Sequence, residues 1–321
     1  MLIKSFMKKN KLLYFVGVSL NKSNLDLLRT KFNLIEVKNI KEALKIKNKK
    51  RILVIYCDQN FFYDDIFLSY FSELQYLITS TTSVQFIDQK FCKNNKIKII
   101  SLENEQNFLS KITCTAEHSL GLMIAISRNY YKAIQSVVEG NFNRRPFGGI
   151  KMLSQSNLGI IGYGRLGKIT KKICTPIFKN IFICDKKIDA NLFKSNLKSV
   201  LLKSDFISLH IPSHNNLNFF SRKNIKIKKK FFLINTSRGE VVSENFILKL
   251  FKKKILLGYA TDVLAGEFNK NFQVKKNLIF RNLRKYNILI TPHIGGSTKD
   301  AWKKTEYRVI QKLIQNIKNT K

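Results

Sequence analysis

The chain has 321 residues and a formal net charge of +37, from 58 lysines and arginines against 21 acidic residues. That length is sufficient for two domains, each with its own hydrophobic core. No apolar run reaches the roughly 18 to 20 residues of a membrane-spanning helix, so we expect a soluble protein with no membrane partner.

The positive charge raises the question of a nucleic-acid partner. The lysines are spread along the whole chain and form no single basic tract, which indicates a general compositional bias. We therefore expect no nucleic-acid partner. A positive field would still attract anionic substrates and cofactors.

Five cysteines are scattered without any CxxC spacing, so we expect no metal site and a reducing, cytoplasmic location. Four lysines precede the apolar run at 12–18, as in a signal peptide, but no small-residue cleavage site follows. We interpret that run as the first strand.

Short apolar runs alternate with helical patterns in the first hundred residues. They lie at 12–18, 34–37, 52–56, 76–78 and 97–100. This alternation predicts a parallel α/β sheet, and it contains no glycine-rich phosphate turn. We assign 1–115 to a substrate-binding domain.

The last helical pattern, at 298–319, is predicted to complete that first domain as part of 296–321. It places Trp302, Val309, Leu313 and Ile317 on one buried face. Asp300 and Glu306 are interpreted as part of a solvated face.

A long helix is predicted from a cap at Thr115 to about Val138, with Glu117 in its first turn. It is placed to cross between the domains. The following segment, 140–152, contains Pro146, Gly148 and Gly149 and is predicted to be an extended arm. His118 within the helix is interpreted as structural, and His214 in a polar loop as solvated.

An apolar strand at 158–161 runs into three glycines, Gly162, Gly164 and Gly167, at the spacing of a dinucleotide turn. The helix that follows is predicted over 165–178. In such a turn the first glycine permits the bend, the second lets the pyrophosphate approach, and the third allows close helix packing. Asp185, 18 residues after Gly167, ends the next strand and would hold ribose hydroxyls, which favours NAD.

Polar residues also end the later strands of this half. His210 follows 206–209, Asp262 follows 258–261, and His293 closes the Thr-Pro-His that follows 288–290. Ligands bind at the carboxyl ends of strands in a doubly wound sheet. The sequence therefore predicts that 116–295 is a Rossmann NAD-binding domain.

These motifs together resemble the D-isomer-specific 2-hydroxyacid dehydrogenases, in the branch similar to 3-phosphoglycerate dehydrogenase. The segments that carry the resemblance are TAEH at 115–118, GYGRLG at 162–167, NTSRG at 235–239, DVLAGE at 262–267 and PHIGGST at 292–298. The resemblance implies an α/β fold of two doubly wound parallel-sheet domains, the second a Rossmann domain, and NAD as cofactor. It also implies a homodimer, with the helix from Ala116 and the arm at 140–152 as the interface.

The resemblance assigns catalysis to three residues. Arg238 would hold a small anionic 2-oxo acid through its carboxylate and carbonyl, and His293 would exchange a proton with the carbonyl oxygen. Glu267 would orient the imidazole. Its loop spans 26 positions to His293, longer than is usual in the family, which leaves open that a neighbour takes its role.

The resemblance also assigns residues that bind the two ligands. For NAD these are Gly162, Gly164, Arg165, Leu166, Gly167, Asp185, His210, Pro212, Thr236, Asp262, His293 and Gly295. For the substrate they are Thr81, Thr82 and Ser83, together with Arg238. The loop at 80–85 lacks the glycines common in relatives, so the substrate is predicted to differ from phosphoglycerate.

A second class stays open at this point. The same fold can serve a non-catalytic, NAD(H)-responsive binding protein, either corepressor-like or associated with nucleic acid. The presence of Arg238, Glu267 and His293 together favours the enzyme, an NAD-dependent oxidoreductase that interconverts a D-2-hydroxy acid and its 2-oxo acid.

Overall fold

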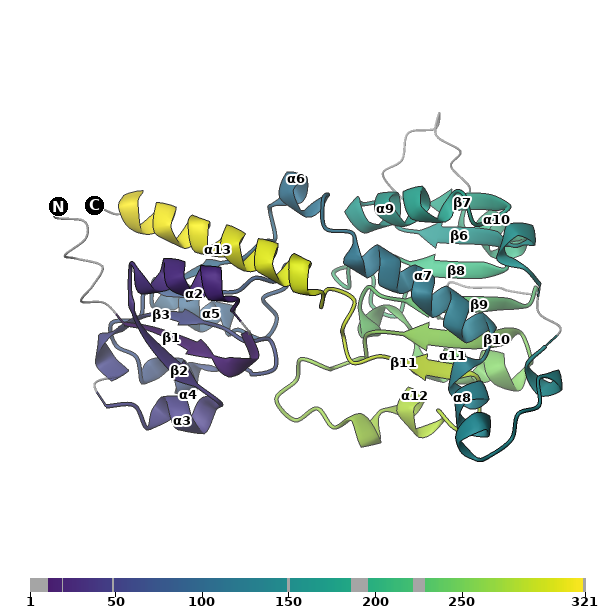
Figure 1. Cartoon of the computed structure of the whole chain (residues 1–321), viewed down its shortest axis with the longest axis horizontal. Coiled ribbons are helices and arrows are strands. Elements are labelled where there is room, and N and C mark those ends of the chain that lie inside the picture. The colour runs from purple at the N-terminus through teal and green to yellow at the C-terminus, as the bar shows by residue number, and fades with distance from the viewer. Residues whose placement is uncertain are drawn as a thin grey trace. The chain divides into compact units, whose positions relative to one another are not determined.

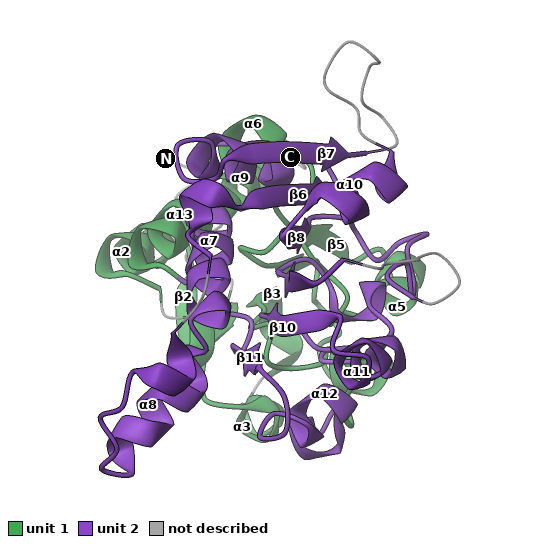
Figure 2. Ribbon diagram, turned by 90° about the vertical axis from the view of Figure 1, so that its right-hand side faces the viewer, with its two compact units in different colours: residues 1–109, 268–271, 298–321 green, residues 110–267, 272–297 purple. Residues whose placement is uncertain are grey.

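The computed structural model describes residues 11–18, 20–47, 49–148, 151–185, 196–221 and 229–319 (Figure 1). The chain forms two compact units (Figure 2). Unit 1 contains the residues up to Leu109, the short segment Phe268–Asn271 and the chain from Thr298 onward; unit 2 contains Ser110–Glu267 and Phe272–Ser297. Segment Phe268–Asn271, which the sequence places in the second domain, therefore belongs to unit 1.

Unit 1 is built on five parallel strands in the order β2-β1-β3-β4-β5. They are β1 (Lys11–Phe15), β2 (Asn33–Val37), β3 (Ile52–Tyr56), β4 (Tyr76–Ile78) and β5 (Lys98–Ile100). The order reverses between β1 and β3, as in a doubly wound sheet. Its helices are α2 (Lys22–Arg29), α3 (Ile40–Leu44), α4 (Asp65–Ser69), α5 (Gln89–Asn94), α6 (Gln106–Leu109) and α13 (Lys299–Asn319).

Short polar residues determine where four helices of unit 1 begin. Asn21, Asn39, Asp64 and Asp88 each have extended backbone and accept a hydrogen bond from the amide three residues later. Such a bond satisfies one amide that lacks a partner within the helix. Side-chain chemistry at these four positions thus sets the strand-to-helix transitions.

The first strand is shorter than predicted. It ends at Phe15, and Val16–Val18 form a 3-10 turn. A Cβ on Gly17 would lie only 1.8 Å from Oδ2 of Asp58, so the chain needs glycine where it passes this buried carboxylate. The strand stops because the backbone turns at that close approach.

Helix α13 buries Val309, Leu313 and Ile317 as predicted. Two other predictions for this helix are wrong: Trp302 is 41% exposed, whereas Glu306 is only 2% exposed. Nδ2 of Asn24, on α2, donates to Oε2 of Glu306 at 3.1 Å. The hydrogen bond compensates for the burial of a polar side chain. Helical periodicity alone predicts that this position is exposed to solvent.

Burial raises the pKa of Glu306 to about 7, and hydrogen bonds from Asn24 and the Asn21 backbone oppose that rise only partly. Because the folded pKa lies above the unfolded value, the stability that this residue contributes is complete below the unfolded pKa and is lost as pH rises through 7. We expect Glu306→Gln to stabilise unit 1 at pH 8 by roughly 1 to 3 kcal/mol, and to remove the fall in stability between pH 5 and 8.

Urea unfolding followed by Trp302 fluorescence tests this expectation, because the only tryptophan of the chain lies one turn before Glu306. Asp300→Asn is the control, since Asp300 lies on the exposed first turn of the same helix. If the free energy of unfolding fell equally between pH 5 and 8 in the wild type and in Glu306→Gln, Glu306 would not be the cause of that fall.

Unit 2 is built on six parallel strands in the order β11-β10-β9-β8-β6-β7. They are β6 (Asn157–Ile161), β7 (Asn180–Cys184), β8 (Phe206–Leu209), β9 (Phe231–Asn235), β10 (Leu256–Thr261) and β11 (Ile288–Ile290). Its helices are α7 (Cys114–Ser127), α8 (Tyr130–Val138), α9 (Arg165–Cys174), α10 (Leu197–Lys203), α11 (Glu244–Lys252) and α12 (Leu278–Arg281). The predicted fold class, two parallel-sheet α/β domains, is confirmed.

Helices cover both faces of this sheet, with α7 and α9 on one side and α10 and α11 on the other (Figure 2). Successive residues of β6 show why: Ile160 belongs to the core cluster that contains Met123 of α7 and Cys174 of α9, whereas Ile161 belongs to the cluster that contains Val200 of α10 and Ile247 of α11. Side chains of a strand point alternately to the two faces, so the central strands are apolar throughout.

The long helix predicted to begin at Thr115 is broken. It forms α7 and α8, and Asn129 between them has φ +50°, a left-handed conformation that asparagine tolerates. The N-cap is Thr113 rather than Thr115, and its hydroxyl donates to Glu117 at 2.5 Å.

Helix α9 also ends earlier than predicted, at Cys174. Pro176 follows two residues later, and proline cannot donate the backbone hydrogen bond that would continue the helix. Within the described ranges, no helix is both long and apolar enough to cross a membrane.

Candidate active site

The dinucleotide turn lies between β6 and α9, where the strand order reverses. Gly162 has φ +94°, and a Cβ there would lie 2.4 Å from the carbonyl oxygen of His210. A Cβ on Gly167 would lie 2.1 Å from the carbonyl oxygen of Gly162, whereas one on Gly164 would meet no atom within 4 Å. Two of the glycines are therefore required by packing, and the third leaves open space above the turn.

Gly164 is the N-cap of α9 and provides no side-chain hydrogen bond. The first amides of a helix lack partners within the helix, and together with the helix dipole they form an anion site. Arg165 and Leu166, in the first turn, are half-buried. The Asp185 carboxylate at the end of β7 accepts a hydrogen bond from the amide of Tyr163 at 2.5 Å. The carboxylate and the phosphate turn thus lie side by side.

We expect Gly167→Ala to destabilise unit 2 by about 1 to 3 kcal/mol, the usual range for overpacking, because its Cβ would collide with the Gly162 backbone. NADH binding should weaken with it, since the same collision distorts the turn. Gly121→Ala is the matched control: this exposed helical glycine has nothing within 4 Å of its Cβ position, and alanine there should stabilise by about 0.5 to 1 kcal/mol. Thermal unfolding by circular dichroism, with an NADH titration, compares the two; equal melting temperatures would contradict the packing argument.

His210 lies across from the turn, at the end of β8. Its Nε2 is 3.0 Å from Oγ of Ser208, and its Nδ1 is among the buried polar atoms of the described residues that have no hydrogen-bond partner. Burial lowers its pKa to about 4, so the ring is neutral at neutral pH. Pro212 lies exposed two residues further on. A buried nitrogen without a partner and an open glycine turn both fit a bound dinucleotide.

The loop after β9 is organised by the side chain of Asn235. Its Oδ1 accepts hydrogen bonds from the amide and the hydroxyl of Ser237, and its Nδ2 donates to the carbonyl oxygen of Arg238. Oγ1 of Thr236 is 2.7 Å from Oγ of Ser119 on α7. Local side-chain hydrogen bonds of this kind hold a loop in one conformation.

The guanidinium of Arg238 donates from Nη1 to the carbonyl oxygen of Ser237 at 2.7 Å. Burial lowers its pKa, while the nearby Glu267 and Glu240 act in the opposite direction; an arginine stays charged under such conditions. The Glu240 carboxylate also accepts the amide of Gly266 at 2.9 Å. The loops that carry Arg238 and Glu267 are thereby joined directly.

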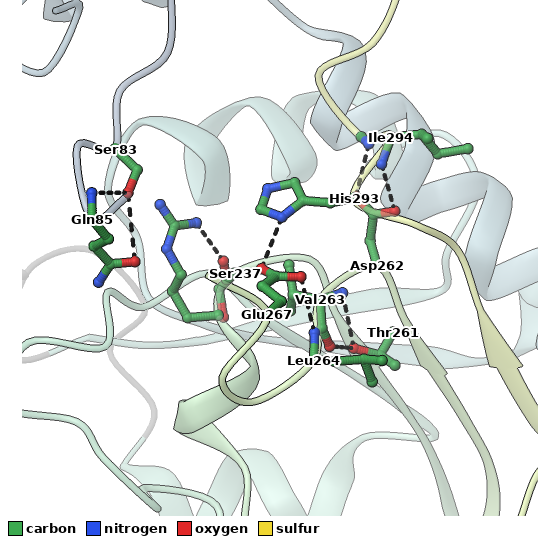
Figure 3. Close-up of polar contacts among 12 residues, drawn as sticks. Ser83, Gln85, Ser237, Thr261, Asp262, Val263, Leu264, Glu267, His293 and Ile294 are labelled. Atoms are coloured by element: carbon green, nitrogen blue, oxygen red, sulfur yellow. Dashed lines mark hydrogen bonds and ion pairs between the residues drawn. The ribbon is translucent and has the colours of Figure 1, made fainter. Parts of the chain in front are cut away.

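His293 and Glu267 form an ion pair (Figure 3). Nδ1 of His293 is 2.8 Å from Oε1 of Glu267, and the other carboxylate oxygen accepts the amide of Leu264 at 3.2 Å. A carboxylate can only accept, so Nδ1 carries a proton and Nε2 is the ring nitrogen that changes protonation state. This arrangement suits a group that gives up and regains one proton.

The turn that carries His293 is held by Asp262, which is 2% exposed and follows β10 (Figure 3). The carbonyl oxygen of Asp262 accepts the amide of His293, and its two carboxylate oxygens accept the amides of Ile294 and Gly295. Burial raises the pKa of Asp262, but hydrogen bonds from His118, Thr291 and these amides outweigh it and lower the pKa. Asp262 is therefore a buried anion.

The three residues assigned to the substrate loop lie in unit 1, after β4. The hydroxyl of Thr81 donates to the carbonyl oxygen of Ser83 at 2.7 Å and lies 3.0 Å from that of Thr79. Ser83 contacts the side chain of Gln85 at 3.5 Å, and Thr82 is exposed. The loop is thus ordered by its own hydroxyls. The other assigned residues lie in unit 2, and among them the structure joins His293 to Glu267 and to Asp262.

Four polar residues support these loops: His118, Ser119, Asn235 and Glu240. From the sequence we interpret His118 as structural and name Asn235 only within a motif, and we assign no role to Ser119 or Glu240. Ser119 is fully buried, and His118 contacts Asp262 and Thr291. The available signal was the polar run Glu117-His118-Ser119, which directly precedes the apolar stretch of the same helix. Polar groups inside a protein are almost always hydrogen-bonded, so such a run predicts partners.

A doubly wound sheet whose glycine turn lies beside an acidic strand end, with an imidazole and a half-buried arginine after further strands, is typical of NAD-dependent dehydrogenases. Residues 120–295 match the family model described as "D-isomer specific 2-hydroxyacid dehydrogenase, NAD binding domain", which is more than half of the chain. The chain belongs to this family, and the predicted resemblance is confirmed. It is an NAD-dependent 2-hydroxyacid dehydrogenase.

Three similar proteins illustrate the relationship. A glycerate dehydrogenase of Methylorubrum extorquens is 28% identical over 239 residues, which is 71% of each chain. A D-3-phosphoglycerate dehydrogenase of Methanocaldococcus jannaschii is 29% identical over 197 residues, which is 59% of this chain and 36% of the relative. The solved structure of D-lactate dehydrogenase from Aquifex aeolicus, complexed with NAD and lactic acid, has a TM-score of 0.75 at 20% identity and covers 96% of each chain.

Proposed function

We propose that this enzyme interconverts a D-2-hydroxy acid and its 2-oxo acid, with His293 and Glu267 as the proton relay and Arg238 as the substrate anchor. The observation that carries the proposal is the 2.8 Å contact between Nδ1 of His293 and Oε1 of Glu267. It gives the imidazole one fixed orientation and one ionisable nitrogen.

NADH, when bound, would supply the hydride for reduction of the 2-oxo acid at C2. As negative charge develops on the carbonyl oxygen, Nε2 of the protonated His293 donates its proton there, and the hydroxy acid forms. The Glu267 carboxylate stabilises the positive charge of the imidazolium before this transfer. In the reverse direction the neutral imidazole accepts the hydroxyl proton.

The ligand contacts are part of the proposal. Arg238 would bind the substrate carboxylate through its planar fork of donors, and Thr81, Thr82 and Ser83 would contribute hydroxyls and amides. Asp262 and Thr236 would serve the nicotinamide end of the cofactor. The remaining NAD contacts would come from Gly162, Gly164, Arg165, Leu166, Gly167, Asp185, His210, Pro212, His293 and Gly295.

NADH oxidation by the purified protein against a panel of 2-oxo acids tests this function. The panel contains phosphohydroxypyruvate, hydroxypyruvate, pyruvate, glyoxylate and 2-oxoglutarate, with NADPH measured in parallel. Turnover of one of them with NADH supports the proposal, and the ranking identifies the side chain that is accepted. Saturable NADH binding without turnover of any panel member would contradict it.

We also propose that the enzyme is a homodimer that pairs through α8 and the arm after it. This region exposes a run of apolar side chains: Ile134, Val137, Val138 at 81% exposure and Phe142 at 96%. Exposed apolar patches of this kind mark protein interfaces. The proposed interface includes the predicted arm at 140–152, of which Gly149 and Ile150 lie outside the described residues.

Val138→Glu combined with Phe142→Glu is expected to convert the dimer into a monomer, because two buried charges would face the partner. Analytical ultracentrifugation measures the mass. Leu217→Glu is the control, since Leu217 is 67% exposed outside this region. A wild-type monomer, or a double variant that still pairs, would contradict the proposed interface.

We propose a cytoplasmic location, because all five cysteines are free thiols.

A further inference from the structure

Helix α7 presents two adjacent polar side chains, His118 and Ser119, to two different loops of unit 2. The hydroxyl of Ser119 donates to the carbonyl oxygen of Thr115 and lies 2.7 Å from Oγ1 of Thr236. Nε2 of His118 lies 3.0 Å from Oγ1 of Thr291 and 3.3 Å from Oδ1 of Asp262. One helix thus contacts both the loop before Arg238 and the turn that carries His293.

The hydrogen bonds fix which nitrogen of His118 carries a proton. The Thr291 hydroxyl has one hydrogen, and it points to Oδ1 of Asp262 at 2.5 Å. Thr291 must therefore accept from His118, so Nε2 of His118 is protonated. The result is a directed chain of hydrogen bonds from His118 through Thr291 to Asp262.

The end of this chain controls the backbone around His293. Asp262 accepts the amides of three consecutive residues, His293, Ile294 and Gly295. His293 has φ +55°, a left-handed conformation that a residue other than glycine keeps only when its surroundings enforce it. An Asp262 side chain that rotated would release two of those three amides.

We propose that His118 is a positioning residue for the dehydrogenase reaction: through Thr291 it fixes the Asp262 carboxylate, and through Asp262 it fixes the direction of the His293 ring. The inference rests on the proposed role of His293. The imidazole of His118 also lies beside Gly295, since a Cβ built on that glycine would be 3.6 Å from Cδ2 of His118.

Two substitutions separate this role from simple packing. His118→Gln keeps a side-chain amide that can donate to Thr291, whereas His118→Leu fills similar space without a donor. We expect the leucine variant to lower kcat by about 10 to 100-fold, the scale of a misplaced catalytic group, and the glutamine variant to stay within about threefold of wild type. NADH affinity, from fluorescence titration, should fall less than kcat in the leucine variant, because the phosphate turn is untouched and only the nicotinamide end proposed for Asp262 depends on this carboxylate.

Thr291→Val tests the middle of the chain. It should lower kcat by less than His118→Leu does, because the 3.3 Å contact between Nε2 of His118 and Oδ1 of Asp262 remains. The double variant His118→Leu with Thr291→Val should be no slower than the slower single variant, since both changes act through the Asp262 carboxylate. His214→Leu, in an exposed loop, is the control. If His118→Leu does not fold, Thr291→Val is the test. A lowered kcat with an unchanged melting temperature supports the inference, and a kcat equal to that of the wild type overturns it.

Wild-type kcat in His118→Leu, or an equal loss in the leucine and glutamine variants, also overturns the inference. His293→Ala is measured alongside. If that variant retains full turnover, the proposed function fails; if it is inactive while His118→Leu is fully active, only the role of His118 fails.

Discussion

Replacing His293 by alanine is expected to lower kcat for 2-oxo acid reduction by about 10² to 10⁴, while NADH still binds. The variant loses the group that donates a proton to the carbonyl oxygen. The glycine turn at Gly162 and the carboxylate of Asp185 are left intact. Steady-state rates at saturating NADH, with a parallel NADH fluorescence titration, separate the two effects.

Glu267→Gln is the companion variant. Its side-chain oxygen can still accept from Nδ1 of His293, but the negative charge that stabilises the imidazolium is gone. We expect a smaller loss than in His293→Ala, because one charge interaction is removed rather than the proton donor itself. Unchanged kcat in His293→Ala would remove this residue from the mechanism.

Arg238→Lys is expected to lower kcat/KM for the 2-oxo acid by about 10 to 150-fold, the equivalent of 1.5 to 3 kcal/mol for a charged hydrogen bond. Lysine keeps the charge but loses the planar fork that matches a carboxylate. It also loses the geometry of the bond from Nη1 to the Ser237 carbonyl. Initial rates over a range of oxo acid concentrations give kcat and KM separately.

Arg281→Lys, on the exposed side of α12, is the matched control and should leave kcat/KM unchanged. NADH affinity should be equal in all three proteins. If Arg238→Lys bound and reduced the oxo acid as well as wild type, the guanidinium would not be the carboxylate anchor.

Apolar patterning predicts the bounds of several strands well. The runs at 52–56, 76–78, 206–209 and 288–290 have the same bounds as β3, β4, β8 and β11. A parallel strand is covered on both faces, so nearly all of its residues must be apolar and its limits are visible in the sequence. The glycine turn is equally visible, because its packing admits no side chain at Gly162 or Gly167.

Features that depend on distant partners are not visible in this way. Glu306 is buried because Asn24, far away in the chain, donates to it, and helical periodicity carries no information on that pairing. The break at Asn129 depends on one residue adopting a left-handed conformation. In the site, the family resemblance identified Glu267 and His293 from the sequence. Only the structure gives the distance of 2.8 Å between Nδ1 of His293 and Oε1 of Glu267.

The division of the chain between the units has a consequence for its synthesis. Unit 1 begins before Ser110 but is completed only by the chain from Thr298 onward, in which Val309, Ile310 and Leu313 are fully buried. Domains generally fold as units while the ribosome elongates the chain. Unit 2, whose last segment ends at Ser297, can therefore fold first. The sheet that is translated first must wait for α13 before the side that this helix contacts, at β4 and β5, is covered.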